Sequence, residues 1–245
     1  MIHARNLHKK FRPEPVLDGL DLELSQGGVH GLLGRNGVGK STLLQLIAGQ
    51  MKPNSGELTV FGQRPFDNAQ VMDRVALTGV DVAYPGSWRV RDVLVGAQLR
   101  YPSWDQASAQ ELVKDFALEQ TLENRYGTLS RGQRAMVGIV VGLASGAPLT
   151  LLDEPYVGLD VHNTRVFYSH LLSLVGGNRT IIMATHHIED AAKVLDSALV
   201  LGRNGRIAAH LWADDVDDYI ARHNLGGPLR HPDFGDAIEH LLEVS

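Results

Sequence analysis

The sequence predicts an α/β fold with a mainly parallel sheet, and two kinds of segment support this prediction. Residues 149–152 and 180–184 are almost wholly apolar runs, typical of strands that are buried on both faces of a parallel sheet. Residues 90–100, 106–118 and 131–144 have helix-like patterns and are separated by turn residues. Strands that alternate with helices indicate an α/β domain.

The N-terminal part is predicted to be rich in β-strands. Residues 16–24 alternate between apolar and polar side chains, which is the period of a half-buried strand. Residues 29–33 form a mostly apolar run, and a helix-compatible segment follows from Ser41 to about Gln50. A strand, a glycine-rich stretch and a helix are therefore expected in succession.

The pattern weakens after about residue 205, and residues 206–245 are expected to form a C-terminal extension. Within it, residues 211–224 and 234–244 are compatible with two amphipathic helices. The recognisable domain is therefore expected to cover residues 1–205.

Composition limits the classes of protein to consider. The 245 residues are 44% hydrophobic and 21% charged, which is enough for a sizeable core. Cysteine is absent, which excludes disulfides and thiolate metal sites. The net charge of −5 argues against binding nucleic acid through bulk electrostatics. The N-terminus lacks the apolar core of a signal peptide.

Residues 135–152 carry no charge and approach the length of a membrane-spanning helix. Residues 145–148, Ser-Gly-Ala-Pro, read as a turn within this stretch. We therefore expect a helix, a loop and a buried strand here, and any membrane-spanning part would belong to another chain.

Residues 34–42 match the phosphate-binding pattern G-x-x-x-x-G-K-S/T between a predicted strand and a predicted helix. Glycines let backbone N–H groups approach phosphate oxygens, and the helix N-terminus favours an anion. Lys40 is expected to reach the β- and γ-phosphates, and the Ser41 hydroxyl to ligate Mg²⁺. The predicted ATP-binding residues of this P-loop are Gly34, Asn36, Gly37, Gly39, Lys40, Ser41 and Thr42.

Asp153 and Glu154 follow the first buried strand, and His186 follows the second. Ligands bind at the carboxyl ends of parallel strands. Asp153 is expected to hold Mg²⁺, usually through water, and Glu154 to activate the water that attacks the γ-phosphate. His186 is expected to donate a hydrogen bond to the γ-phosphate or the attacking water. If His186 points inward, its neighbour His187 points elsewhere.

The stretch Leu-Ser-Arg-Gly-Gln at 129–133 resembles the signature sequence of the ABC-type ATPases, and it lies between the P-loop and the acidic strand as in that family. The resemblance covers roughly residues 1–205. It implies that two such domains pair head to tail and enclose two ATP molecules. The residues that would contact the partner's ATP are Ser130, Arg131, Gly132 and Gln133. Residues 158–160 resemble the loop that crosses the dimer interface through Asp160.

The same resemblance assigns other roles. Phe11 stands where the family has an aromatic residue that stacks on adenine, and core packing is the alternative reading. Glu154 and His186 match the catalytic glutamate and the switch histidine. The family's glutamine at the end of the strand near residues 75–78 is missing, because its position falls near Val80 or Asp81. Asp81 offers an oxygen to Mg²⁺ but no amide hydrogen bond, which puts the coupling step in doubt.

The sequence therefore predicts an α/β P-loop NTPase core with an N-terminal antiparallel β subdomain and an inserted helical subdomain at about 81–141. The predicted function is that of an ATP-hydrolysing subunit of an ABC transporter, with ATP and Mg²⁺ as cofactors. We expect it to be a peripheral protein on the cytoplasmic face of the cell membrane. Its predicted partners are transmembrane permease subunits and a second ATP-binding subunit, without nucleic acid.

Two alternatives remain open. One is a soluble ABC-type ATPase that acts on ribosomes or DNA, although such members usually carry two motif sets or long coiled coils. The other is a P-loop kinase of small molecules, which leaves residues 129–133 unexplained. Residues 101–105 resemble an exporter-linked branch of small bacterial ABC ATPases.

Overall fold

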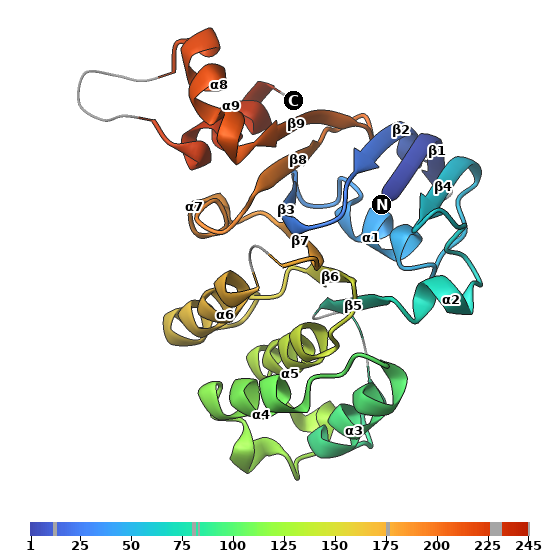
Figure 1. Ribbon diagram of the computed structural model, residues 1–245, viewed down its shortest axis with the longest axis vertical. Coiled ribbons are helices and arrows are strands. Elements are labelled where there is room, and N and C mark those ends of the chain that lie inside the picture. Colours follow the sequence, from blue (N-terminus) through green and yellow to red (C-terminus); the bar gives the residue numbers. More distant parts are fainter. Residues whose placement is uncertain (12–13, 80–81, 83, 175–176, 226–231, 245) are drawn as a thin grey trace.

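The strands of the computed structural model form two sheets, and the described residues are 1–11, 14–79, 82, 84–174, 177–225 and 232–244. The smaller sheet is antiparallel and contains, in spatial order, β2 (Pro15–Leu24), β1 (Ile2–Lys10) and β4 (Ser55–Val60). The larger sheet contains, in spatial order, β5 (Val75–Gly79), β6 (Leu149–Asp153), β7 (Thr180–Thr185), β3 (Gly28–Leu33), β8 (Ser197–Leu201) and β9 (Ile207–Trp212). Its strands are parallel except that β9 is antiparallel to β8, which confirms the predicted α/β class (Figure 1).

The helices lie around the larger sheet. They are α1 (Lys40–Ile47), α2 (Ala69–Met72), α3 (Val90–Arg100), α4 (Gln106–Asp115), α5 (Arg131–Ala144), α6 (Val161–Ser173), α7 (Ile188–Ala191), α8 (Val216–His223) and α9 (Phe234–Val244). The predicted bounds of α3 and α5 are confirmed. Helices α1 and α4 each end three residues earlier than expected, and the bounds of helices commonly shift by a few residues.

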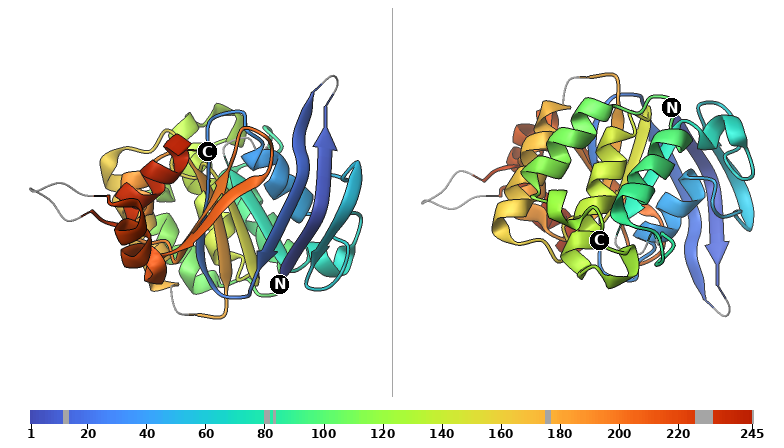
Figure 2. Two further views of the ribbon diagram at one scale, coloured as in Figure 1. Left: turned by 90° about the horizontal axis from the view of Figure 1, so that it is seen from above. Right: turned by 90° about the horizontal axis from the view of Figure 1, so that it is seen from below.

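Strands β6 and β7 of the larger sheet are buried on both faces, as predicted. Leu151 and Ile182 belong to the core on one face, where α1 lies between the two sheets (Figure 2). Leu152 and Met183 belong to the core on the other face, with side chains of α5 and α6. This alternation follows from the two-residue period of a strand, and it fixes the direction in which each strand ends.

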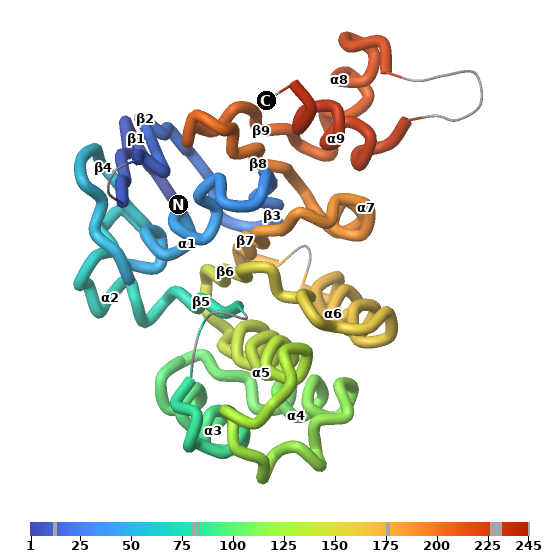
Figure 3. Tube along the Cα trace, turned by 180° about the vertical axis from the view of Figure 1, so that it is seen from behind, coloured from blue at the N-terminus to red at the C-terminus, as the bar shows by residue number. Residues whose placement is uncertain are grey.

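Helices α3, α4 and α5 form the inserted helical part beside β5, and α8 and α9 lie at the opposite end of the molecule (Figure 3). The uncharged stretch 135–152 consists of the rest of α5, a turn and β6, as expected. Within the described ranges, no helix has both the length and the apolar character needed to cross a bilayer.

The prediction of one helix over residues 211–224 is wrong in its first part. Leu211 and Trp212 belong to β9, where they pair with Ala198 and Ser197 of β8. The helix begins only at Val216. The edge of β8 needs backbone hydrogen bonds, and this long-range requirement overrides the local helical pattern. Helix α9 matches the predicted 234–244.

Candidate active site

The loop between β3 and α1 leads into a helix that has no side-chain cap. Gly39 precedes α1 with φ 116°, and a Cβ there would lie 2.8 Å from Cγ1 of Val16, so this position requires glycine. No side chain caps α1, and its first turn has no acidic residue. The first amides of α1 are therefore available to an anion. Around them, Asn36, Gly37 and Ser41 are exposed.

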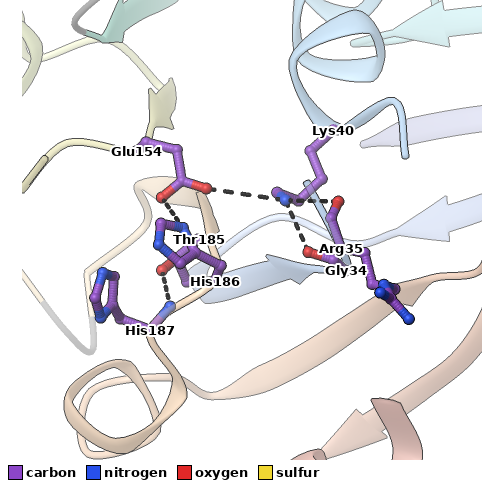
Figure 4. A network of polar contacts seen from close by, with 7 residues as sticks. All are labelled: Gly34, Arg35, Lys40, Glu154, Thr185, His186 and His187. Atoms are coloured by element: carbon purple, nitrogen blue, oxygen red, sulfur yellow. Dashed lines mark hydrogen bonds and ion pairs between the residues drawn. The ribbon is translucent and has the colours of Figure 1, made fainter. Parts of the chain in front are cut away.

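Lys40 is a buried cation at the centre of this loop, with a side chain that is only 6% exposed. Its Nζ donates hydrogen bonds to Gly34 O at 2.8 Å and to Arg35 O at 3.2 Å (Figure 4). Burial lowers the pKa of Lys40, and the charges of Glu154 and Asp153 oppose this shift. The ammonium is thus held against the backbone of the loop that precedes α1.

Glu154 connects the loop to the end of the neighbouring strands. Its Oε1 lies 3.8 Å from Lys40 Nζ, and its Oε2 lies 2.9 Å from His186 Nδ1. Its backbone is unusual, because φ is 47° and the N–H donates to Ala184 O at 3.0 Å. A non-glycine residue in the left-handed region is uncommon and is often found at functional sites.

The rings of His186 and His187 lie close together, with their centres 4.2 Å apart, but the two residues have different hydrogen-bond partners (Figure 4). His186 points to Glu154, whereas the His187 N–H donates to Thr185 Oγ1 at 2.9 Å. Because an ionised Glu154 only accepts, His186 Nδ1 must donate the proton. A neutral His186 then has no proton on Nε2, so it donates to a phosphate only when the ring is protonated or leaves Glu154. This constraint depends on the contact with Glu154 and is not visible in the sequence.

Thr185 was not among the predicted site residues, and its hydroxyl accepts the hydrogen bond that fixes the turn at His187. The signal was present, because a threonine two residues before the N–H that it binds is a recognised turn pattern. The role of Ala184 O carries no such signal, since a backbone carbonyl acts here.

The four ionisable residues of the predicted site come from one edge of the larger sheet. Lys40 follows β3, Asp153 ends β6 and Glu154 follows it, and His186 follows β7. Neighbouring parallel strands bring these ends together, as Asp153 pairs with Ala184 in register. Ser41 and Thr42 lie on the first turn of α1, beside Lys40.

The signature residues form a second cluster at the start of α5. Ser130 Oγ accepts a hydrogen bond from Gln133 N at 3.1 Å, and Gln133 Oε1 accepts one from Ser130 N at 3.0 Å. This reciprocal cap fixes the first turn of α5. A Cβ on Gly132 would lie 2.3 Å from Gly158 O, so the loop 158–160 packs directly on the signature loop. Arg131 is exposed.

Asp160 is the N-cap of α6, and its Oδ1 accepts a hydrogen bond from Asn163 N at 2.8 Å. Phe11 is 48% exposed at the end of β1, with Lys9 Nζ 5.3 Å from the centre of its ring. Its predicted stacking on adenine stays a prediction. Val80 and Asp81, where the family's glutamine is missing, lie outside the described residues.

Comparisons with known proteins agree with these features. A family model described as ABC transporter matches residues 17–157. A zinc transport system ATP-binding protein of Treponema pallidum is 31% identical over 234 residues, covering 90% of this chain and 85% of that protein. A daunorubicin resistance ATP-binding protein of Streptomyces coeruleorubidus is 30% identical over 217 residues, covering 85% of this chain and 67% of that protein.

The chain spans 63% of a Nod factor export ATP-binding protein of Rhizobium meliloti, to which it is 31% identical over 215 residues. Two solved structures share the fold. An ATP-binding subunit of an ABC transporter has a TM-score of 0.82 at 24% identity, covering 98% of this chain and 99% of that one. A dimeric ATP-binding cassette with ADP and Pi has a TM-score of 0.74 at 23% identity, covering 86% and 98%. The chain therefore belongs to the ABC transporter family and is an ATPase of that family.

Proposed function

We propose that this chain is the subunit that binds and hydrolyses ATP to power substrate translocation through separate transmembrane subunits. The observation that carries the proposal is the meeting of Lys40, Glu154 and His186 at one edge of the sheet, beside helix amides without a side-chain cap. These groups are a cation for phosphate, a candidate base and its hydrogen-bond partner, which is the set that nucleotide hydrolysis needs.

The phosphates of ATP would lie along residues 34–42. Lys40 would exchange its present acceptors, Gly34 O and Arg35 O, for oxygens of the β- and γ-phosphates. The amides at the start of α1 would donate to the remaining oxygens. Phe11 would stack on the adenine ring.

Ser41 and Asp153 would hold Mg²⁺. A hydroxyl and a carboxylate are the oxygen ligands that this ion prefers, and both residues flank Lys40 or Glu154 in the chain. Bound there, Mg²⁺ would neutralise negative charge on the oxygens of the β- and γ-phosphates.

Glu154 would accept the proton of the attacking water. The water oxygen then bonds to the γ-phosphorus, and the bond to the oxygen that bridges the β- and γ-phosphates breaks, which yields ADP and phosphate. His186 Nδ1–H would keep the carboxylate oriented through its 2.9 Å hydrogen bond. A carboxylate fixed by a hydrogen bond loses less orientational freedom on reaching the transition state.

A second subunit would complete the site. Among the described residues, no hydrogen bond or ion pair joins the signature residues 130–133 to the P-loop of the same chain. We propose that Ser130, Gly132 and the N-terminus of α5 contact the γ-phosphate held by the partner, and that Asp160 crosses the interface. ATP would then close the dimer, and hydrolysis would open it.

The proposed setting is the cytoplasmic face of a membrane, next to permease subunits. The support is family membership, together with relatives whose names place them in drug resistance, Nod factor export and zinc transport. These names differ in substrate and direction, so the proposal extends to the transport role alone.

Two measurements test the proposal. The purified chain with Mg²⁺ and ATP should release free phosphate, whereas a phosphorylated small molecule would show a kinase instead. Affinity purification from native membranes should recover a polytopic membrane protein with this chain. Recovery of ribosomes or DNA in its place would show a soluble ABC-type ATPase.

A further inference from the structure

A short turn precedes the signature loop, and the first helical turn of α5 reaches back to hold it. The turn is the 3₁₀ segment Tyr126–Thr128. Arg134 lies four residues after Ser130, and its Nη2 donates to Gly127 O at 2.8 Å. Its guanidinium carbon also lies 5.8 Å from the centre of the Tyr126 ring. Arg134 thus bridges the residues on both sides of Ser130.

The other side of this turn is attached to the loop that leads into α3. Tyr126 N donates to Trp88 O at 2.8 Å, and Gly127 N donates to Gly86 O at 3.0 Å. The Tyr126 ring is buried and meets Tyr84 edge-on at 5.2 Å. With this side fixed through the backbone, Arg134 connects the turn to α5 through a side-chain hydrogen bond.

The charge of Arg134 lies in an electrostatically unfavourable place, which a role in folding alone does not explain. A cation near a helix N-terminus is repelled by the positive end of the helix dipole. The first turn of α5 has no acidic residue, and Arg134 forms no ion pair within the described part of the chain. Its Nε is also buried without a hydrogen-bond partner there. Violations of this kind concentrate at functional sites.

We propose that Arg134 is a positioning residue for the signature loop. By holding Gly127 O, it fixes the chain that enters Ser130, so that the Ser130 hydroxyl and the first amides of α5 face the second subunit's γ-phosphate. Its charge adds to the positive potential of that helix end. The proposal rests on the proposed function, because it presumes that a second subunit presents a nucleotide to this loop.

The matched variants are Arg134→Met and Arg134→Lys. Methionine keeps an unbranched stem against Tyr126 but removes the donor and the charge. In Arg134→Met, kcat for ATP hydrolysis should fall about 10- to 100-fold, since misplacing a contact group by about 1 Å has effects of that size. Arg134→Lys retains a charge and a hydrogen-bond donor group and should recover most of the loss. Arg222→Gln, which removes an exposed arginine on α8, is the control.

Two readouts separate positioning from a general loss of stability. The affinity of the monomer for a fluorescent ATP analogue should change less than about twofold, because the P-loop of the same chain is untouched. In the Glu154→Gln background, ATP-dependent dimerisation measured by size exclusion should weaken in Arg134→Met and return in Arg134→Lys. Hydrogen exchange of residues 126–133 should accelerate in Arg134→Met without a matching change in β6.

The proposed function and the positioning role of Arg134 fail on different results. If wild-type protein neither hydrolyses ATP nor dimerises with it, the proposed function fails, and the hydrogen-exchange result still decides whether Arg134 fixes the loop. If wild type is active and Arg134→Met keeps its kcat, the positioning role is wrong. A variant that loses ATP affinity and kcat in equal proportion would also overturn it.

Discussion

Glu154 and His186 share a hydrogen bond of 2.9 Å between Oε2 and Nδ1, although 32 residues separate them in the sequence. The other oxygen of Glu154 lies 3.8 Å from the ammonium of Lys40. The carboxylate is therefore attracted from two sides, by a histidine N–H and by the buried cation. This geometry orients the carboxylate, and an oriented carboxylate is what a general base requires.

Glu154→Gln should lower ATP hydrolysis by about 10²- to 10⁴-fold, because an amide accepts the His186 hydrogen bond but takes no proton from water. ATP binding should persist, since the P-loop is unchanged. Phosphate release at saturating ATP measures hydrolysis, and equilibrium nucleotide binding measures the affinity for ATP. Glu111→Gln, which changes an exposed residue of α4, is the control. Near-normal turnover in the first variant would remove Glu154 from its role.

Lys40→Met should weaken ATP binding by roughly 10- to 150-fold, the value of a lost charge-assisted hydrogen bond. The variant keeps the apolar stem in its buried place but offers no donor to phosphate oxygens. Equilibrium binding of ATP with Mg²⁺ measures the change. Lys114→Met, at an exposed position, should bind ATP as wild type does. Equal affinity for ATP in Lys40→Met and wild type would contradict the proposed phosphate site.

Gly132→Ala should destabilise the chain by about 1–3 kcal/mol, the usual effect of overpacking. The added Cβ would lie 2.3 Å from Gly158 O, and a backbone atom has little freedom to move aside. Alanine otherwise favours a helix over glycine, so a loss identifies the contact as the cause. Chemical denaturation measures the change, and ATP-dependent dimerisation should weaken with it.

Gly96→Ala on α3 is the matched control, because its Cβ meets only the Trp88 side chain, at 3.1 Å. Its stability should stay within about 1 kcal/mol of wild type. If both alanine variants behave alike, the approach of residues 158–160 to the signature loop has no special importance.

Much of the candidate site was predictable because its residues stand in short motifs at the ends of apolar strands. Once 149–152 and 180–184 are parallel neighbours, Glu154 and His186 must meet at one edge of the sheet. Periodicity likewise predicted α3 and α5 to the residue. These features depend on local patterns and on one topological rule.

The remaining features depend on contacts between distant segments. Nothing near Gly132 shows that Gly158 O will lie against it. The strand at Leu211 forms because β8 has a free edge, which no local pattern records. The proton on His186 Nδ1 follows from its partner, and the partner is known only from the folded structure.

Stability should fall as the pH drops below about 6.5, partly because of His30. Burial lowers the pKa of His30, and Gly27 and Asp196 offset this only in part. His30 Nε2 donates to Gly27 O at 2.8 Å, so its Nδ1 must accept from the Ser197 hydroxyl, also at 2.8 Å. Protonation of Nδ1 would break this arrangement.

The sign follows from linkage. Because the folded pKa of His30 lies below the unfolded value, the unfolded chain binds more protons as the pH falls through about 6.5, and stability declines. Burial, together with His30, lowers the pKa of His210 in the same direction. Urea midpoints from about pH 8 to pH 5 should show a shallower decline in His30→Gln than in wild type. The exposed His3→Asn is the control, and identical slopes in all three proteins would contradict the prediction.

Arg179→Met should destabilise the chain by about 2–4 kcal/mol, because it removes several buried hydrogen bonds to a charged group. The Arg179 guanidinium donates to Leu143 O at 2.6 Å, Gly142 O at 2.5 Å and Thr150 Oγ1 at 2.6 Å. It thus caps the C-terminus of α5, where a cation is favoured by the helix dipole.

Burial lowers the pKa of Arg179 to about 10, which still leaves it charged at neutral pH. In the methionine variant, the carbonyls at the end of α5 lose their donor in a place that water does not easily reach. Arg179→Lys should fall between the two, since an ammonium supplies fewer donors in a different geometry. Chemical denaturation gives the free energies, and the exposed Arg203→Met is the control. A methionine variant as stable as wild type would mean that water replaces the guanidinium without loss, and that Arg179 contributes little to holding α5 against the sheet.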